Sequence, residues 1–328
     1  MEKNILAVFD RDEEYVTKLM NYLLEAKPMP LNVQAFTDKL MLKKYMKEND
    51  VDILLIPEEE LDDEIEAVGP EEMMVLSESD SAEDSKGHKT VCKYQSSENI
   101  MREVMCYYAE KPVAEVGLVN SQKTQLFAVY SPVRRCFRTS FAIALGQVLS
   151  ERGRSLYVNL EDYSGFNQIL QKNYMADLSD LIFYIGQKKR NFSYKLASMV
   201  QTLGNLDFIP PVISPVDLKA VDRDTWITFV NELQNCGYEN IIFDFGDSIQ
   251  GFLEILSVCT TIYTPVREDF VSSSKIEQYE AMLRILECGE VLRKTKKITI
   301  PYFRNFNGRP EKLISTPMGD YARTVLKV

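Results

Sequence analysis

The chain has 328 residues, of which 45% are hydrophobic, and it carries a formal net charge of −11 at pH 7. This length and this composition are ordinary for a globular protein with two domains, each with its own core. The acidic excess argues against bulk electrostatic binding to DNA or to an anionic membrane, because both need surplus cations. We therefore expect no nucleic acid partner.

Cysteine and histidine usage excludes two further kinds of site. The six cysteines form no C-x-x-C pair, and His88 is the only histidine, so neither a zinc site nor a Cys/His nucleophile pair is expected. The N-terminal residues turn acidic after a short apolar run, and no apolar run approaches the roughly 18 residues of a membrane span. We expect a cytoplasmic protein without a transmembrane segment, which partners can recruit to the inner face of the membrane.

The first 111 residues alternate between predicted strands and predicted helices. The strands are Asn4–Phe9, Leu31–Phe36, Val51–Ile56, Met73–Leu76 and His88–Tyr94. The first predicted helix follows Asp10 and ends near Glu25, and the other two are Asp38–Asn49 and Ser97–Tyr108. Such alternation predicts a parallel sheet that helices cover on both faces.

Polar residues at the strand ends give this domain a family resemblance. Asp10 and Asp12 follow the first strand, Ser77 follows the fourth, and Lys93 follows the fifth. Their order resembles that of a response-regulator receiver domain. This resemblance implies that Asp10 and Asp12 hold Mg²⁺. A solvated pair of acids at a helix N-terminus is an equally good interpretation of Asp10 and Asp12.

The phospho-acceptor of the receiver family is missing. It should follow the third strand, where the sequence has Pro57 and then Glu58. Proline cannot accept phosphate, and glutamate would at most imitate the charged state, so we predict a pseudo-receiver. The stretch 57–85 contains 13 Asp or Glu and no Lys or Arg. A solvated loop is its usual meaning, and docking of a basic partner surface is the alternative.

A polar linker is predicted at 112–124, and a second α/β domain at 125–328. Its predicted strands are Leu126–Tyr130, Ser155–Leu160, Leu206–Ile209, Asn240–Phe245, Thr261–Val266 and Lys297–Tyr302. Its predicted helices are 138–152, 178–186, 192–203, 222–236, 250–259, 273–291 and 318–327. The fold class is therefore α/β, with two doubly wound domains: a flavodoxin-like receiver domain and a second domain with a mostly parallel sheet.

The second domain resembles the MinD/ParA group of P-loop ATPases. The resemblance rests on the strand–loop–helix at Leu126–Ser140, on YVNLE at 157–161, on IIFDFGDS at 241–248, and on TPVRED at 264–269. Together with the preceding pseudo-receiver, it is most similar to the TadZ/CpaE-type proteins of pilus assembly. That resemblance implies a homodimer, ATP and Mg²⁺ as cofactors, and pilus-assembly or secretion proteins as partners.

The phosphate loop departs strongly from the pattern of that family, K-G-G-x-G-K-[ST]-[ST]. Val133 stands at the position of the signature lysine, and Arg138 at that of the P-loop lysine. The three glycine positions hold Arg134, Arg135 and Phe137. Glycines permit positive φ and close approach of backbone N–H groups to phosphate, which a bulky side chain at such a position opposes. Arginine keeps the charge of lysine but is a larger planar fork. The three arginines can attract an anion only through their side chains.

The rest of the predicted nucleotide site is better preserved. The resemblance assigns Thr139 and Asp244 to Mg²⁺, Ser140 to the loop, and Asp247 to the segment after the Walker-B strand. Residues with the same properties also occur without a ligand, since Thr and Ser suit a first helical turn and Asp244 ends an ordinary strand.

Three more residues lie at or near the site by resemblance. Arg267 follows a strand at the edge where the family places base-binding and dimer-contact residues, although it can equally solvate the next helix. Asn159 and Glu161 occupy the neighbourhood of the family's water-positioning aspartate.

The sequence thus predicts a localisation or scaffold protein of a Tad-type pilus or secretion apparatus, with no catalytic residues and weak nucleotide binding at most. The alternative is a divergent Mg-ATP-binding ATPase in which Arg138 replaces the lysine. A DNA-partition protein is a third possibility, which the net charge disfavours.

Overall fold

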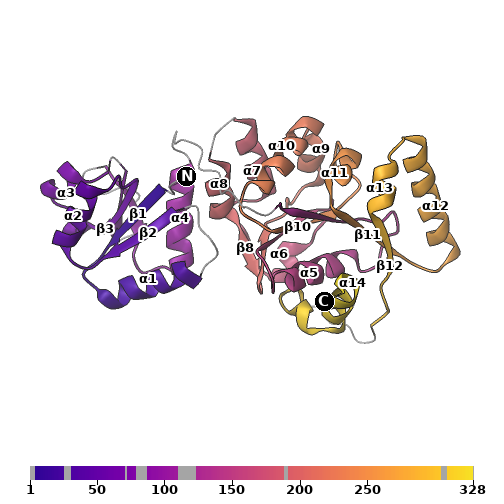
Figure 1. The fold of residues 1–328 in the computed structure, drawn as a ribbon, viewed down its shortest axis with the longest axis horizontal. Helices are drawn as coiled ribbons and strands as arrows, with labels where there is room; N and C mark the ends of the chain where they lie inside the picture. Colours follow the sequence, from indigo (N-terminus) through magenta and orange to yellow (C-terminus); the bar gives the residue numbers. More distant parts are fainter. Residues whose placement is uncertain are drawn as a thin grey trace. The chain divides into compact units, whose positions relative to one another are not determined.

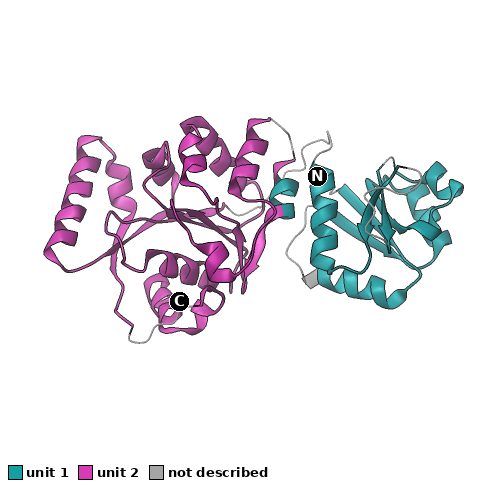
Figure 2. Cartoon of the chain, turned by 180° about the vertical axis from the view of Figure 1, so that it is seen from behind, with its two compact units in different colours: residues 1–117, 193–198 teal, residues 118–192, 199–328 magenta. Residues whose placement is uncertain are grey.

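The computed structural model describes the chain except residues 1–3, 26–30, 71, 79–86, 110–122, 188–190, 304–308 and 328. The chain folds into two compact units, which are called the first and the second domain below (Figure 2). The first comprises 1–117 and 193–198, and the second comprises 118–192 and 199–328. Most of the predicted linker 112–124 lies outside the described residues, so the predicted boundaries at 111 and 125 stay predictions.

A five-stranded parallel sheet forms the first domain (Figure 1). The strand order is β2-β1-β3-β4-β5, which is a doubly wound arrangement. The strands are β1 (Asn4–Phe9), β2 (Leu31–Phe36), β3 (Ile53–Pro57), β4 (Met73–Ser77) and β5 (Lys89–Cys92). All residues of β3 and β4 are buried, as is expected of strands that helices cover on both faces.

The helices of this domain connect successive strands. They are α1 (Glu13–Glu25), α2 (Lys39–Glu48), the 3₁₀ turn η1 (Glu58–Glu60), α3 (Asp63–Val68) and α4 (Ser97–Ala109). Asp38 and Asp62 cap α2 and α3, since each side chain accepts a hydrogen bond from a first-turn N–H group. The acidic run after β3 is therefore partly helical, where the sequence indicated a loop.

A seven-stranded sheet forms the second domain, in the order β12-β11-β6-β10-β7-β9-β8. All strand pairs are parallel except β8 with β9 at one edge. The strands are β6 (Gln125–Val129), β7 (Ser155–Leu160), β8 (Gln201–Leu203), β9 (Leu206–Ile209), β10 (Asn240–Phe245), β11 (Thr261–Val266) and β12 (Thr295–Thr299). The predicted fold class, α/β with two doubly wound domains and a mostly parallel second sheet, is confirmed.

Helices pack on both faces of this sheet, with α5 and α14 on one face and α9, α10 and α11 on the other (Figure 1). The helices of the second domain are α5 (Arg138–Leu149), α6 (Phe166–Leu170), α7 (Leu178–Gly186), α9 (Pro215–Ala220), α10 (Arg223–Gln234), α11 (Phe252–Val258), α12 (Phe270–Ile285), α13 (Gly289–Lys294), the 3₁₀ segment η2 (Pro310–Ser315) and α14 (Pro317–Leu326). The helix α8 (Phe192–Met199) belongs mostly to the first domain. The core lies between α5 and the central strands, where Phe141, Tyr157 and Phe208 are fully or almost fully buried.

The segments α6, α9 and η2 were not predicted, and three predicted elements between 192 and 302 differ clearly in type or bounds. The predicted helix 192–203 ends at Met199, and Gln201–Leu203 turns back as the antiparallel edge strand β8. The predicted helix 273–291 is two helices, because Glu287 adopts a left-handed conformation with φ of 56° between them. The last strand is Thr295–Thr299, where 297–302 was predicted.

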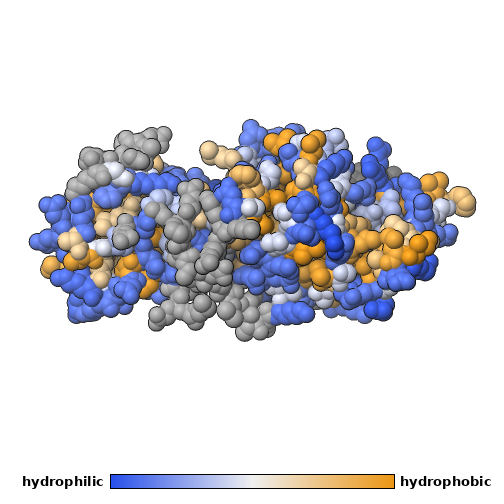
Figure 3. Space-filling model, turned by 90° about the horizontal axis from the view of Figure 1, so that it is seen from above, coloured by the Kyte–Doolittle hydropathy of each residue, from blue (hydrophilic) through white to orange (hydrophobic). Residues whose placement is uncertain are grey.

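Large hydrophobic side chains are exposed mainly on the second domain. They include Tyr163, Ile213, Phe270 and Ile285. Hydrophobic surface gathers on this domain in the face that Figure 3 shows. No helix in the described part of the chain combines the length and the apolar character that a membrane crossing requires.

Candidate functional site

The candidate site lies where the three adjacent parallel strands β6, β10 and β7 end. Asp244 of β10 pairs with Val129 of β6 on one side and with Asn159 of β7 on the other. Because the carboxyl ends of parallel strands meet at one edge, the loop from Tyr130 to Phe137 and the residues after β7 and β10 come together there. The predicted strand–loop–helix is thus formed, with α5 beginning at Arg138.

Buried contacts fix the path of the loop. The hydroxyl of Ser131 donates a hydrogen bond to the carbonyl of Pro265 at 2.6 Å and accepts one from the N–H of Val133 at 3.1 Å. Val133 and Cys136 are buried, and they form a small apolar cluster with Ile276. Val133, which stands where the family has its signature lysine, therefore anchors the loop to its own domain.

Two residues of the loop adopt left-handed backbone conformations. Arg135 has φ of 57° and Phe137 has φ of 58°. Both stand where the resemblance places glycines, so the loop keeps a conformation that suits glycine while it carries large side chains. Each such residue costs on the order of 1–2 kcal/mol. Phe137 also packs partly against the main core of the domain, which offsets its strain.

Replacing Arg135 by glycine is expected to stabilise the second domain. Relief of the left-handed strain contributes on the order of 1–2 kcal/mol, and the added flexibility of the unfolded chain takes back up to about 1 kcal/mol. The net gain in the free energy of unfolding should be about 0.5–1 kcal/mol, measured by urea denaturation. Arg134→Gly is the matched control, because Arg134 is exposed in the same loop and has no positive φ, so it should lower stability. A loss of stability in both variants would contradict this account.

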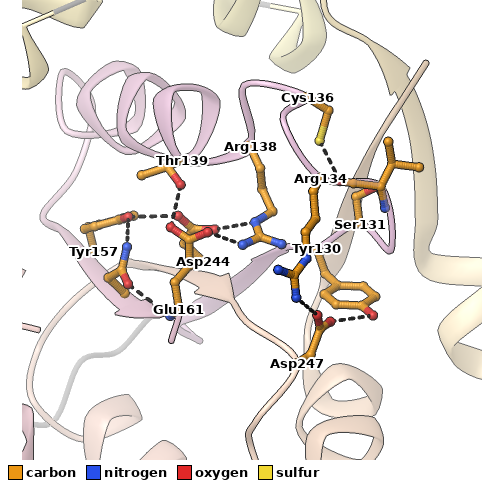
Figure 4. A network of polar contacts seen from close by, with 12 residues as sticks. Tyr130, Ser131, Arg134, Cys136, Arg138, Thr139, Tyr157, Glu161, Asp244 and Asp247 are labelled. Carbon is orange, nitrogen blue, oxygen red and sulfur yellow. Dashed lines mark hydrogen bonds and ion pairs between the residues drawn. The ribbon is translucent and has the colours of Figure 1, made fainter. Parts of the chain in front are cut away.

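Arg138, the first residue of α5, points back into the domain and joins two carboxylates (Figure 4). Its Nε lies 3.1 Å from Oδ1 of Asp244, and its Nη2 contacts Oε1 of Glu161. The side chain of Arg138 is 15% exposed, and that of Asp244 is completely buried. The guanidinium thus forms a charge-assisted bridge across the ends of β10 and β7.

Each of the four carboxylate oxygens in this group has a donor. Besides the two contacts of Arg138, the hydroxyl of Tyr157 donates to Oδ2 of Asp244 at 3.0 Å, and the hydroxyl of Thr139 donates to Oε2 of Glu161 at 2.7 Å. This set of four side chains (Arg138, Thr139, Glu161 and Asp244), together with Tyr157, is called the arginine–carboxylate cluster below. A buried group of side chains in which every carboxylate oxygen has a donor is held in one arrangement.

The charges of this cluster are strongly coupled. Burial raises the pKa of Asp244, and the charge of Glu161 raises it further, whereas Arg138 opposes both effects. Burial alone would lower the pKa of Arg138, but the two carboxylates outweigh it and raise this pKa above its ordinary value. Burial and the charge of Asp244 raise the pKa of Tyr157, so its hydroxyl keeps its proton and remains a donor.

A backbone approach brings Glu161 to this position. The N–H of Gly246 donates to the carbonyl of Leu160 at 3.0 Å. A Cβ atom at Gly246 would lie 2.7 Å from that carbonyl oxygen and 3.0 Å from Cα of Glu161. Only glycine allows the segments after β10 and β7 to lie so close together.

A cavity of about 360 Å³ opens beside the loop. Of the residues predicted to bind the cofactor, six line it: Arg134, Arg135, Arg138, Thr139, Ser140 and Asp247. Asp247 accepts a hydrogen bond from the hydroxyl of Tyr130 at 3.2 Å and lies 3.4 Å from Nη2 of Arg134 (Figure 4). The volume suits a small ligand, but Glu161, Asp162 and Asp247 on its wall offset the charge of the arginines.

Two predicted residues of the site lie differently. Asp244 belongs to the arginine–carboxylate cluster and does not line the cavity. Arg267 lies outside the residues that line the cavity, and its Nε is 3.8 Å from Oδ2 of Asp269, which caps α12. The base-binding role that the resemblance gives Arg267 stays a prediction.

The residues present do not fit a bound Mg²⁺ in their observed arrangement. A magnesium ion needs free carboxylate and hydroxyl oxygens and coordinated water. Arg138 and Tyr157 occupy the oxygens of Asp244, and the hydroxyl of Thr139 points to Glu161. The predicted ligands Thr139 and Asp244 are therefore paired within the protein and are not free to hold the ion.

In the first domain, a lysine likewise lies against the acid that the receiver resemblance assigns to Mg²⁺. Nζ of Lys93 is 2.6 Å from Oδ2 of the buried Asp10. Burial alone would lower the pKa of Lys93, but the hydrogen bond and the charge of Asp10 raise it. Asp12 accepts hydrogen bonds from the N–H groups of Glu14 and Tyr15 at the start of α1. Asp12 thus caps the helix, in line with the alternative interpretation of the acidic pair.

The roles of two cluster members were not predicted from the sequence. Glu161 was expected near the nucleotide but not as a partner of Arg138, and Tyr157 belonged to the YVNLE motif without an assigned role. Tyr157, Asn159 and Glu161 are every second residue along β7 and its end, so their side chains point to one face of the sheet. Asp244 points to the same face, because it pairs with Asn159. An acid and a hydroxyl at that spacing beside a Walker-B-like aspartate were the available signal.

Comparison with known proteins identifies the first domain. Residues 2–109 match the family model "TadZ-like, receiver domain". No curated protein matches the chain. This match covers the first domain, and the predicted resemblance to TadZ/CpaE-type proteins is confirmed.

Similar solved structures come from partition and cell-division proteins. A plasmid partition protein from Borrelia burgdorferi is 13% identical, with a TM-score of 0.47, and the match covers 63% of this chain and 97% of that one. A ParA family ATPase from Chlorobium tepidum is 18% identical, with a TM-score of 0.45, covering 63% and 92%. The MinC:MinD cell division protein complex from Aquifex aeolicus is 13% identical, with a TM-score of 0.47, and the match covers 62% of this chain and 96% of that one.

Proposed function

We propose that this protein is a non-catalytic localisation or scaffold protein of a Tad-type pilus or secretion apparatus, which acts by dimerisation and by binding partner proteins. The observation that carries the proposal is the TadZ-like receiver domain, in which Pro57 ends the strand that should present the phospho-acceptor. A receiver domain without that aspartate has no phosphorylation switch, so its remaining use is as a binding module.

The second domain supports the same conclusion. Its phosphate loop has large side chains where glycines would cradle a phosphate, and its candidate metal ligands are paired within the domain, Asp244 with Arg138 and Thr139 with Glu161. Such a site has lost both the backbone cradle and the free carboxylate on which nucleotide hydrolysis depends. Exposed hydrophobic side chains such as Tyr163, Ile213 and Phe270 provide surface for protein contacts.

The proposal predicts that purified protein hydrolyses Mg-ATP no faster than buffer does. Calorimetric titration with Mg-ATP should give no heat of binding, or heat of weak binding only. In cells that build such a pilus, a fluorescent fusion of the chain should localise with the apparatus, and deletion should prevent pilus assembly. Arg135→Gly, which leaves the cluster intact, is a suitable control for correct folding of the fusion. Hydrolysis that Asp244→Asn abolishes, together with diffuse localisation, would overturn the proposal.

A second candidate is a divergent ATPase or nucleotide-binding protein, and the cavity beside the loop favours it. Arg134, Arg135 and Ser140 line a space of about 360 Å³ at the N-terminus of α5. An anion bound there would contact side chains and the first N–H groups of the helix. Tight binding of Mg-ATP that Arg138→Ala weakens would select this candidate over the scaffold.

A further inference from the structure

The arginine–carboxylate cluster places two acids where one cation holds them together. Asp244 comes from β10, and Glu161 follows the neighbouring strand β7. Asp244 is completely buried, and the side chain of Glu161 is 21% exposed. Two carboxylates in such a place repel one another and lose most of their hydration, so a cation between them is needed to keep both ionised.

The cation in this position is the guanidinium of Arg138. It contacts both acids through separate nitrogens, as the planar fork of arginine allows. The Thr139 hydroxyl, the third oxygen that a metal would use, donates to Glu161. The site is therefore complete without an ion.

We infer that Arg138 is a built-in cation that takes the place of a divalent metal, so that the ends of β7 and β10 are held in one arrangement whether or not Mg²⁺ is present. The inference deepens the proposed function, because a scaffold needs one constant state. It also assigns a latent metal site: without Arg138, the oxygens of Asp244, Glu161 and Thr139 would face one another as hard ligands of the kind that Mg²⁺ and Mn²⁺ take. The adjoining cavity offers room for the water that completes such a coordination shell.

The test is thermal unfolding of the full chain with and without Mg²⁺ alone, at constant ionic strength and without nucleotide. Trp226 is the only tryptophan and is buried in α10, so its fluorescence reports on the second domain. The Tm of the wild-type protein should not change with Mg²⁺. Arg138→Gln should lower the Tm by roughly 6–20 °C, because one partner of a buried charge pair is lost. Saturating Mg²⁺ should then raise the Tm of this variant by about 5–10 °C.

Two further variants make the result specific. Arg134→Gln removes an exposed arginine of the same loop and should change neither the Tm nor its response to Mg²⁺. The double variant Arg138→Gln/Asp244→Asn removes one acid together with the cation, so it should recover most of the lost Tm and should not respond to Mg²⁺. Mn²⁺ bound to Arg138→Gln should be detectable by electron paramagnetic resonance, and absent from the wild type.

Several results would overturn the inference. A wild-type Tm that rises with Mg²⁺ would show that Arg138 gives way to the ion, and a folded Arg138→Gln protein without any response would show that no latent site exists. If Arg138→Gln fails to fold, recovery only in the presence of Mg²⁺ supports the inference. Failure even with Mg²⁺, or failure of the double variant, contradicts it. None of these outcomes depends on pilus localisation or ATP binding, so the proposed function can fail or stand separately.

Discussion

Asp244→Ala is expected to lower the free energy of unfolding of the second domain by about 2–6 kcal/mol, because two buried donors lose their acceptor and each such loss costs about 1–3 kcal/mol. Removing the carboxylate leaves the guanidinium of Arg138 with one partner and leaves the hydroxyl of Tyr157 without its acceptor. Urea denaturation followed by the fluorescence of Trp226 measures the effect.

Two variants separate a structural from a nucleotide-binding role of Asp244. Asp247→Ala is the matched control, since Asp247 follows the same strand but is half exposed and pairs with Arg134 at 3.4 Å, so its loss should cost less than about 1 kcal/mol. Asp244→Asn keeps an acceptor for Arg138 or Tyr157 and should cost roughly 1–3 kcal/mol. A cost for Asp244→Ala no larger than that of Asp247→Ala would show that the cluster does not stabilise the fold.

The strands of both domains were predictable because their apolar runs are continuous and have distinct ends. Asn4–Phe9, Ser155–Leu160 and Asn240–Phe245 were predicted with the bounds that the structure has. The edge strand Gln201–Leu203 was not, because three residues carry no periodic signal and follow a helix directly. The short helices in the acidic run were missed for a related reason: their stability comes from a cap such as Asp62 and from tertiary contacts more than from their own pattern.

The candidate site was predictable in its members but not in its pairing. The loss of glycines and lysine is visible in the sequence, and six of the eight predicted cofactor residues line one cavity. The direction of Arg138 was not predictable, since its partners Glu161 and Asp244 lie 23 and 106 residues further along the chain. Only the order of β6, β10 and β7 in the sheet brings them together.

The two domains share a chemical feature, an acid paired with a basic side chain, which was not predicted from the sequence. In each, the acid that ends a central strand and would hold Mg²⁺ in the resembled family is paired with a basic side chain of the same domain, Asp10 with Lys93 and Asp244 with Arg138. Each domain also departs from the resembled family at a second position, where Pro57 stands in place of the phospho-acceptor and Phe137 in place of a loop glycine. Internal pairing of this kind fixes each strand end in one conformation.

A buried glutamine of α5, the helix that carries Arg138, binds the C-terminal segment 309–326. Gln147 is completely buried, and its amide nitrogen donates to the carbonyls of Leu203 at 3.1 Å and Pro310 at 2.9 Å. Its amide oxygen accepts a hydrogen bond from the N–H of Ile314 at 2.8 Å. One side chain thus pairs three backbone groups from β8 and η2.

Gln147→Ala should therefore lower the free energy of unfolding of the second domain by about 3–6 kcal/mol, because three backbone groups lose their partner and each costs about 1–3 kcal/mol, less where water enters the space. Urea denaturation measures this loss, and hydrogen exchange should show reduced protection of residues 309–326. Gln278→Ala on the exposed face of α12 is the control and should change stability by less than about 0.5 kcal/mol. If Gln147→Ala behaves like this control, the C-terminal segment is held by its apolar contacts with α5, among them the ring of Tyr321 against Phe141.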